Sequence, residues 1–172
     1  RERHFNGHRF NSLDLKTFSD ESFSVGDLSF QPFEVPHHPG YPNFGFAVSY
    51  KEGESWKNAV FVTDFNDGET ALDYFVDADF IFVESNHDLD LLAKHFNPNS
   101  RYHMSNPQTA RLLYMTCSQS KKKPHTVMLG HLSSQRNTES VALEEMQDAF
   151  RVKGMDLDFR LFAAPLCESS RV

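Results

Sequence analysis

The sequence has 172 residues, 39% of them hydrophobic, which is enough for one domain with a packed core and too short for two comfortable ones. Its formal net charge of -7 argues against a protein that coats polyanions generally, although a local basic patch would still allow a nucleic-acid substrate. Cys117 and Cys167 form no CxxC motif, which favours a reducing, cytoplasmic location. No apolar run reaches the roughly 18 residues that a membrane span needs, so no membrane partner is expected.

The first part of the chain predicts a short polar lead-in followed by β-structure. Residues 1–21 are polar and aperiodic, and two short apolar runs then flank Gly26-Asp27, a dipeptide typical of a tight hairpin turn. A loop rich in proline and glycine follows, and a polar connector over 51–57 separates two further β-rich runs. The strands are expected near 22–25, 28–35, 44–50 and 58–64.

The second part of the chain alternates between helical and strand patterns. Helical spacing covers 68–77, 88–96, 105–117 and 138–154, and strand-like runs cover 79–85, 125–130 and 156–164. Ser105 and Pro107 are typical of a helix start, and Gly154 is typical of a helix end. Strands that feed into alternating helices and strands predict a mixed α/β (α+β) layered domain over 22–172.

Polar side chains follow four of these predicted strands. Because the carboxyl ends of strands joined by helical crossovers line one edge of a sheet, residues far apart in sequence are expected to converge there. Imidazole nitrogens and carboxylate oxygens suit zinc, manganese or iron, and the pattern therefore points to metal-assisted hydrolysis. The strand-end residues are His37, His38, Asp64, Glu84, Asn86, His87, Asp88 and His131.

Each of these residues also has a purely structural interpretation. A single histidine after a strand is most often a loop residue bonded to the backbone, and Asp64 could cap the turn that follows it. Glu84, or the Ser85 or Asn86 that follows, could cap the helix that begins near residue 88. His4 and His8 are not expected to be ligands, because Asn6 and Gly7 interrupt their helical spacing.

Five segments occur in an order that resembles a known family. They are "FEVPHHPGYPNFGFAV", "VFVTDF", "VESNHD", "YHMSNPQTARLL" and "VMLGHLSSQRNT". Together they resemble the second half of metallo-β-lactamase-fold hydrolases, in particular the YycJ/WalJ-like branch, with ribonuclease Z as a more distant relative. The resemblance runs from about residue 22 to the end of the chain. It implies an αββα sandwich with a dinuclear metal site at one edge of its two sheets.

The resemblance also implies roles for particular residues. His37 matches the third histidine of the first metal site, with the neighbouring His38 as a competitor, and Asp64 matches the aspartate that bridges both ions. His131 matches the last histidine, a ligand of the second ion. His87 belongs to the branch motif and is a weaker metal candidate. Asp64 is counted with the catalytic residues as well.

Glu84 and His103 match a catalytic pair that lies near the scissile phosphate in ribonuclease Z-like members. The pairing makes physical sense, because a carboxylate beside an imidazole favours the protonated form. That form can donate a proton to a leaving oxygen.

The chain departs from the family by lacking the HxHxDH motif, which supplies two ligands to each ion. Three candidate ligands over two sites cannot complete two metal shells. We therefore expect this polypeptide, which begins with arginine, to be the C-terminal half of an enzyme. Such a half is expected to be inactive alone unless another segment or chain supplies the rest. It is also expected to expose apolar surface and to associate, for example as a homo-oligomer.

The resulting expectation is a metal-dependent hydrolase of phosphodiester bonds with two zinc or manganese ions. The resemblance favours a nuclease that acts on DNA ends, with DNA preferred over RNA as partner. One alternative keeps the fold and changes the substrate to a small cyclic phosphodiester or a thioester. Another is a non-catalytic scaffold that has lost the first metal motif.

Overall fold

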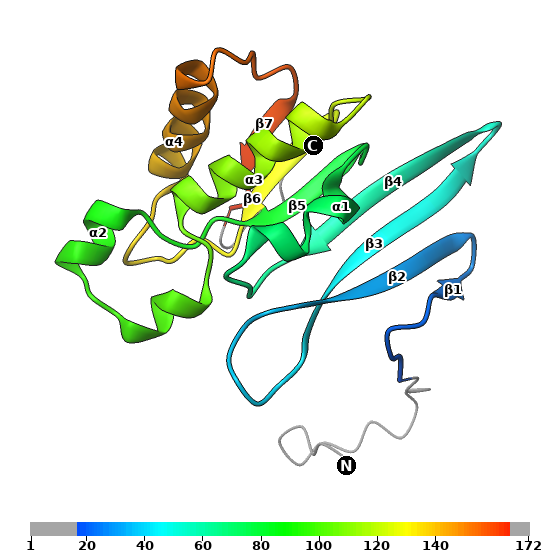
Figure 1. Cartoon of the computed structure of the whole chain (residues 1–172), viewed down its shortest axis with the longest axis horizontal. Coiled ribbons are helices and arrows are strands. Elements are labelled where there is room, and N and C mark those ends of the chain that lie inside the picture. The colour runs from blue at the N-terminus through cyan, green and yellow to red at the C-terminus, as the bar shows by residue number, and fades with distance from the viewer. Residues whose placement is uncertain (1–16, 166–172) are drawn as a thin grey trace.

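The computed structural model describes residues 17–165, which form a seven-stranded sheet with helices (Figure 1). His4, His8 and Cys167, and most of the predicted lead-in over 1–21, lie outside these residues. The strands follow one another across the sheet in sequence order. They are β1 Phe23–Val25, β2 Leu28–Val35, β3 Asn43–Glu52, β4 Ser55–Val62, β5 Phe80–Glu84, β6 Thr126–Gly130 and β7 Arg160–Ala163.

Strands β1 to β4 form an antiparallel meander. The tight turn at Gly26-Asp27 is confirmed, with Val25 paired to Leu28 and Gly26 at a φ of 58°, a value that glycine adopts without strain. The prediction of a polar connector over 51–57 was wrong. Most of these residues belong to the β3–β4 hairpin, whose two strands are paired as far as Glu52 and Ser55. Its polar side chains face water while the backbone completes the ladder, so polarity alone does not indicate a loop there.

Strands β4 to β7 are parallel and are joined by helical crossovers, as the alternating pattern predicts. The helices are η1 Gly68–Thr70, α1 Leu72–Phe75, α2 Leu89–Lys94, η2 Pro98–Tyr102, α3 Asn106–Gln119 and α4 Glu139–Val152. Since β2 and β4 are both antiparallel to β3, the strands β2, β4, β5 and β6 all run in the same direction. Their carboxyl ends therefore meet at one edge. None of the helices in residues 17–165 is long and apolar enough to cross a membrane.

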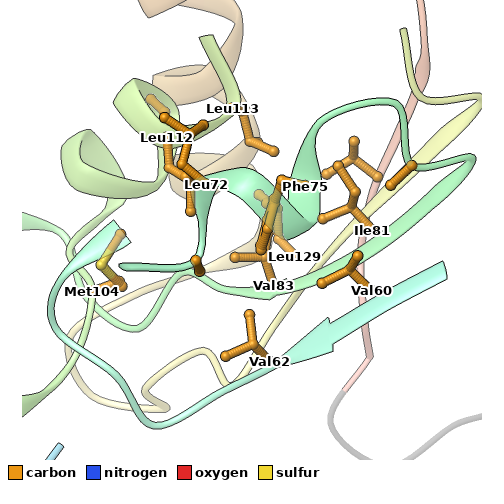
Figure 2. Packing of buried hydrophobic residues seen from close by; sticks show 14 of the residues in the cluster. Val60, Val62, Leu72, Phe75, Ile81, Val83, Met104, Leu112, Leu113 and Leu129 are labelled. Carbon is orange, nitrogen blue, oxygen red and sulfur yellow. The ribbon is translucent and has the colours of Figure 1, made fainter. Parts of the chain in front are cut away.

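The main core lies between the sheet and the helices α1, α3 and α4. Figure 2 shows strand residues such as Val60 and Ile81 facing Phe75 of α1 and Leu113 of α3. Each of these four side chains is at most 1% exposed. Burial of a side chain of this size stabilises the fold by about 1.5–3 kcal/mol. This packing fixes the strand ends that carry the polar residues.

The other face of the sheet carries a row of apolar side chains in direct register across five strands. The helices of the main core pack on the opposite face. Phe61 in this row is 41% exposed, and its ring centroid lies 6.4 Å from that of Phe82. A sheet with two apolar faces is typical of the inner layer of a sandwich. The row is Phe46, Phe61, Phe82, Met128 and Phe162.

Candidate metal centre

Three histidines surround the carboxylate of Asp64 at the edge where the strands end. One oxygen of Asp64, Oδ1, lies 3.9 Å from Nε2 of His37, 3.8 Å from Nδ1 of His103 and 3.7 Å from Nε2 of His131. The ring of His103 stands between the other two, with centroid distances of 5.0 Å to His37 and 5.2 Å to His131. The structure thus brings together residues that are up to 94 positions apart in the chain (131 minus 37).

Asp64 and His131 share an uncommon backbone conformation. Each follows the end of a strand, β4 or β6, with φ values of 59° and 54°, in the left-handed region that non-glycine residues rarely adopt. Side-chain amides hold both turns, since Nδ2 of Asn43 donates to the carbonyl of Asp64 at 2.6 Å and Nδ2 of Asn86 donates to that of His131 at 2.9 Å. Backbone strain of this kind, about 1–3 kcal/mol per residue, concentrates at functional sites.

Glu84 lies beneath this cluster and is fully buried. Its Oε1 atom is 2.7 Å from Nδ1 of His103 and 3.5 Å from Nδ1 of His131. Its Oε2 atom accepts hydrogen bonds from the backbone N–H groups of Asp64 and Phe65. Burial by itself raises the pKa of this carboxyl, but the interactions with the two imidazoles outweigh it and lower the pKa below its usual value. Glu84 is therefore a buried carboxylate anion that stabilises positive charge on the imidazole of His131.

Glu84 in turn raises the pKa of His131. Its hydrogen bond to Glu84 raises the pKa of the imidazole, burial opposes this, and the negative charges of Glu84 and Asp64 add to the increase. His131 stands between two carboxylates, with Nδ1 toward Glu84 and Nε2 toward Asp64. A carboxylate behind a histidine also orients the ring of a metal ligand.

The donor atoms fit a divalent transition metal. Two groups of three side chains have ligand atoms that all lie within 4.8 Å of one another: His37, Asp64 and His103, and Glu84, His103 and His131. Mixed imidazole and carboxylate donors suit zinc and manganese. Asp64 has a histidine on each side, so its carboxylate is close enough to both for a bridging position. Further donors would be required to fill two coordination shells.

Two weaker metal candidates lie outside these groups. His38 is exposed, and its Nδ1 atom contacts the carbonyl of the adjacent Pro39 at 2.8 Å. His87 is buried, and burial lowers the pKa of its imidazole. The geometry therefore favours His37 over His38.

The capping roles considered for two site residues belong to other aspartates. Asp88 caps α2, since its Oδ1 atom accepts a hydrogen bond from the N–H of Leu91 at 2.8 Å. Asp67 caps η1 in the same way. Asp64 and Glu84 therefore do not cap these two helices.

Several buried polar residues that support the site were not anticipated. The hydroxyl of Thr109 donates to the carbonyl of Glu84 at 2.7 Å. Asn106 and Asn137 bond to each other, and Nδ2 of Asn137 donates to the carbonyl of Ser85 at 2.7 Å. The sequence gives only a weak indication of these roles. Asn106 and Thr109 lie in the first turn of α3, beside the predicted cap, where polar side chains often bond to backbone groups.

Comparisons with known proteins find similarity in structure and none in sequence. No protein-family model matches the chain, and no curated protein matches it. The metallo-β-lactamase-fold protein YhfI from Bacillus subtilis superposes with a TM-score of 0.63 at 14% identity, covering 87% of this chain and 52% of YhfI. A diphosphatase of the PhnP family gives a TM-score of 0.50 at 13% identity, covering 85% of this chain and 44% of its own.

A third solved structure, a metallo-β-lactamase superfamily protein from Thermotoga maritima, gives a TM-score of 0.50 at 11% identity and covers 86% of this chain and 70% of its own. The chain thus spans about half the length of YhfI and of the PhnP-family diphosphatase. At these identities the likeness concerns the fold alone. The order of the strands, the helical crossovers and these superpositions together show that the chain has the mixed α/β architecture of the metallo-β-lactamase fold.

Proposed function

We propose that this chain carries the catalytic edge of a metal-dependent hydrolase of phosphodiester bonds, and that it acts as a nuclease on DNA ends. The observation that carries the proposal is the single oxygen of Asp64 that faces His37, His103 and His131 at 3.7–3.9 Å. The PhnP-family neighbour is a diphosphatase, so a phosphoryl substrate is compatible with this architecture. The YycJ/WalJ-like resemblance favours DNA.

In this proposal His37, Asp64 and His131 would hold two divalent ions, zinc or manganese, with Asp64 shared between them as the resemblance implies. Bound ions of this kind lower the pKa of water to about 7 and neutralise charge on a phosphoryl group. His37 is held in place by its Nδ1 atom, which lies 3.0 Å from the carbonyl of Tyr102. Its Nε2 atom is then directed toward Asp64.

In this proposal His103 acts as the general acid, and Glu84 orients it. Oε1 of the buried Glu84 lies 2.7 Å from Nδ1 of His103 and orients the ring, and in this proposal Nε2 of the ring would donate a proton to the departing oxygen. The other oxygen of Glu84 is held by two backbone N–H groups, so the pair cannot rotate freely. A positioned general acid of this type contributes about 10²–10⁴-fold to a rate.

We propose further that a second segment or chain completes both coordination shells. With His103 acting as the acid, the metal donors that residues 17–165 supply in this proposal are His37, Asp64 and His131, which are too few to fill two shells. The apolar row from Phe46 to Phe162 supplies a face on which a second sheet would pack. The chain alone is then expected to bind metal weakly and to have little activity.

A metal titration followed by an activity assay tests the proposal. Calorimetry with Zn²⁺ and Mn²⁺ should detect binding to the wild-type chain and a loss of binding in Asp64→Ala and His131→Ala. In the complete protein, 5′-labelled DNA should be degraded in the presence of metal, and a cyclic nucleotide is the comparison substrate. Full hydrolysis of DNA by the Asp64→Ala variant would exclude this scheme.

A further inference from the structure

Arg101 lies beside the proposed metal centre and is tied to the two loops that carry its ligands. The backbone carbonyl of Arg101 accepts a hydrogen bond from Nδ2 of Asn66 at 3.1 Å, and Asn66 follows Asp64 by two residues. The carbonyl of the next residue, Tyr102, lies 3.0 Å from Nδ1 of His37. These two contacts hold Arg101 at the edge of the centre.

The side chain of Arg101 is held against the ring of Tyr102. Its Nη2 atom donates a hydrogen bond to the hydroxyl of Tyr102 at 2.6 Å, and its Cζ atom lies 4.7 Å from the centroid of the ring. A guanidinium over an aromatic face is attracted by the ring and loses part of its conformational freedom. An anion that binds Arg101 therefore meets a positive charge whose position is already restricted.

The positive charge of Arg101 has no acidic partner in the described part of the chain. By contrast, Nη2 of Arg111 lies 2.9 Å from the carboxylate of Glu69. Arg101 is also exposed, so its remaining N–H groups can reach a ligand. The planar guanidinium presents these donors in a geometry that matches two oxygens of a phosphate.

Arg101 and His103 form part of the wall of one surface hollow. The hollow lies between α2, η2 and the start of α3 and has a volume of about 480 Å³. This volume is within the range of about 300–1,000 Å³ that is typical of small-molecule sites. A ligand in this hollow therefore has both the guanidinium and the imidazole within reach.

We propose that Arg101 binds the phosphate that adjoins the scissile one in a DNA strand. The inference rests on the proposed function and specifies which substrates the site accepts. Arg101 forms no ion pair with Asp64, the carboxylate at the centre of the site, which has three histidines around it. It therefore stands outside the group of residues proposed to act on the scissile phosphate, and the next phosphate along the strand is the anion within its reach.

This contact would distinguish a nucleic-acid strand from a small phosphodiester. A strand carries further phosphates beside the scissile one and gains the interaction with Arg101. A cyclic nucleotide has a single phosphate and does not gain it. A phosphate contact carries no information about the bases, so no preference for a particular base is expected from Arg101.

The test measures how strongly the chain binds a fluorescently labelled oligothymidylate, by fluorescence anisotropy in Mn²⁺ at several salt concentrations. A phosphate contact releases counterions, so Arg101→Gln should weaken binding severalfold and reduce the slope of log K against log salt by about 0.7. Arg160→Gln is the matched control, because Arg160 is exposed at the amino end of β7, away from the carboxyl ends of the strands. It removes the same charge and should change neither quantity.

Two further measurements distinguish the phosphate contact from a structural role. The Zn²⁺ affinity measured by calorimetry should be the same in wild type and Arg101→Gln, since the contacts to His37 and Asn66 use backbone carbonyls that the substitution retains. In the complete protein, the KM for labelled DNA should rise severalfold at unchanged kcat. This result is expected when the lost contact is equally strong in the ground state and in the transition state.

The outcomes separate this inference from the proposed function. Equal affinities and salt slopes in wild type and Arg101→Gln would overturn the contact and leave the metal centre standing, as would a wild-type chain that does not bind oligothymidylate. Equal weakening by Arg160→Gln would reduce the effect to net charge and overturn the contact as well. A loss of Zn²⁺ affinity or a fall in kcat in Arg101→Gln would overturn the assignment to the adjoining phosphate. Weaker DNA binding by Arg101→Gln, in a chain that binds no Zn²⁺, would support the contact and count against the proposed metal centre.

Discussion

Nδ1 of His103 lies 2.7 Å from Oε1 of the fully buried Glu84, and this pair connects the interior of the sheet to its polar edge. The second imidazole on the same oxygen is His131, at 3.5 Å. Glu84 therefore contacts two imidazoles through one oxygen, and the first predictions concern this carboxylate.

Replacing Glu84 by glutamine should lower the pKa of His131. The hydrogen bond to Glu84 is the largest cause of the raised pKa, and its negative charge adds to the effect. In Glu84→Gln the pKa should fall toward the ordinary histidine value of about 6.5. NMR titration of the imidazole resonances measures the change, and an unaltered His131 pKa would show that Glu84 does not control this ring.

The same substitution should slow catalysis in the complete protein. Without the carboxylate, His103 loses the charged partner that lies 2.7 Å from its Nδ1 atom. We expect kcat on labelled DNA to fall by about 10²-fold or more. Wild-type kcat in the variant would remove the acid pair from the mechanism.

Stability should depend on pH through the same groups. The pKa of Glu84 is lower in the folded protein than in the unfolded chain, where it is about 4.3. The carboxylate therefore stabilises the fold above about pH 4.3, and this stabilisation is lost as the pH falls through the lower pKa of the folded state. The pKa of His131 is higher in the folded protein than in the unfolded chain, where it is about 6.5. The imidazole therefore stabilises the fold fully below about pH 6.5, and this stabilisation is lost as the pH rises through the higher pKa of the folded state. Both contributions are therefore present between about pH 4.3 and 6.5. The difference in melting temperature between wild type and Glu84→Gln should be largest there, and a difference independent of pH would contradict this linkage.

Metal should stabilise the chain through His37 and leave His38 unused. Ligand binding to the folded state adds about 2.7 kcal/mol when the free ligand is at 100 times its Kd. The melting temperature should therefore rise with Zn²⁺ in wild type and in His38→Ala, and the rise should be smaller in His37→Ala. The reverse pattern would identify His38 as the ligand.

Asn106→Ala should destabilise the fold by about 2–4 kcal/mol in urea denaturation. Oδ1 of Asn106 accepts bonds from Ser85 Oγ at 2.7 Å and from Asn137 Nδ2 at 2.8 Å, and the substitution deprives both donors of this acceptor inside the protein. Asn99→Ala is the matched control, because Asn99 is exposed and should change stability by less than about 0.5 kcal/mol. Equal effects of the two substitutions would mean that the buried network contributes little.

Phe61→Lys should reduce self-association of the isolated chain. Phe61 is 41% exposed and lies between Phe46 and Phe82 in the apolar row on the sheet face opposite the main helices. Analytical ultracentrifugation should show association that increases with concentration in wild type and is weaker in the variant. Trp56→Lys, at an aromatic residue of β4 that is 58% exposed and whose position in the strand places it on the opposite side, should have little effect.

Much of the fold was predictable because its signals are local. Hydrophobic alternation, the Gly26-Asp27 turn, the Ser105 cap and the Gly154 helix end each lie within a few residues of the element they define. The predicted helices and strands of the second half all appear, although the helix expected over 68–77 is divided into η1 and α1 and the strand expected over 156–164 is limited to Arg160–Ala163. The hairpin over 51–57 escaped prediction because its backbone pairing does not depend on apolar side chains.

The sequence by itself determined which residue types follow the strands, and their family resemblance assigned Asp64, His37, His131, Glu84 and His103 to a site. Only the tertiary structure decided that β2 runs in the same direction as β4, β5 and β6, which brings those strand ends to one edge. It also decided that Asp64 and His131 adopt left-handed turns and that Glu84 is buried beneath them. These features depend on strand pairing and packing between distant segments, and no window of neighbouring residues contains that information.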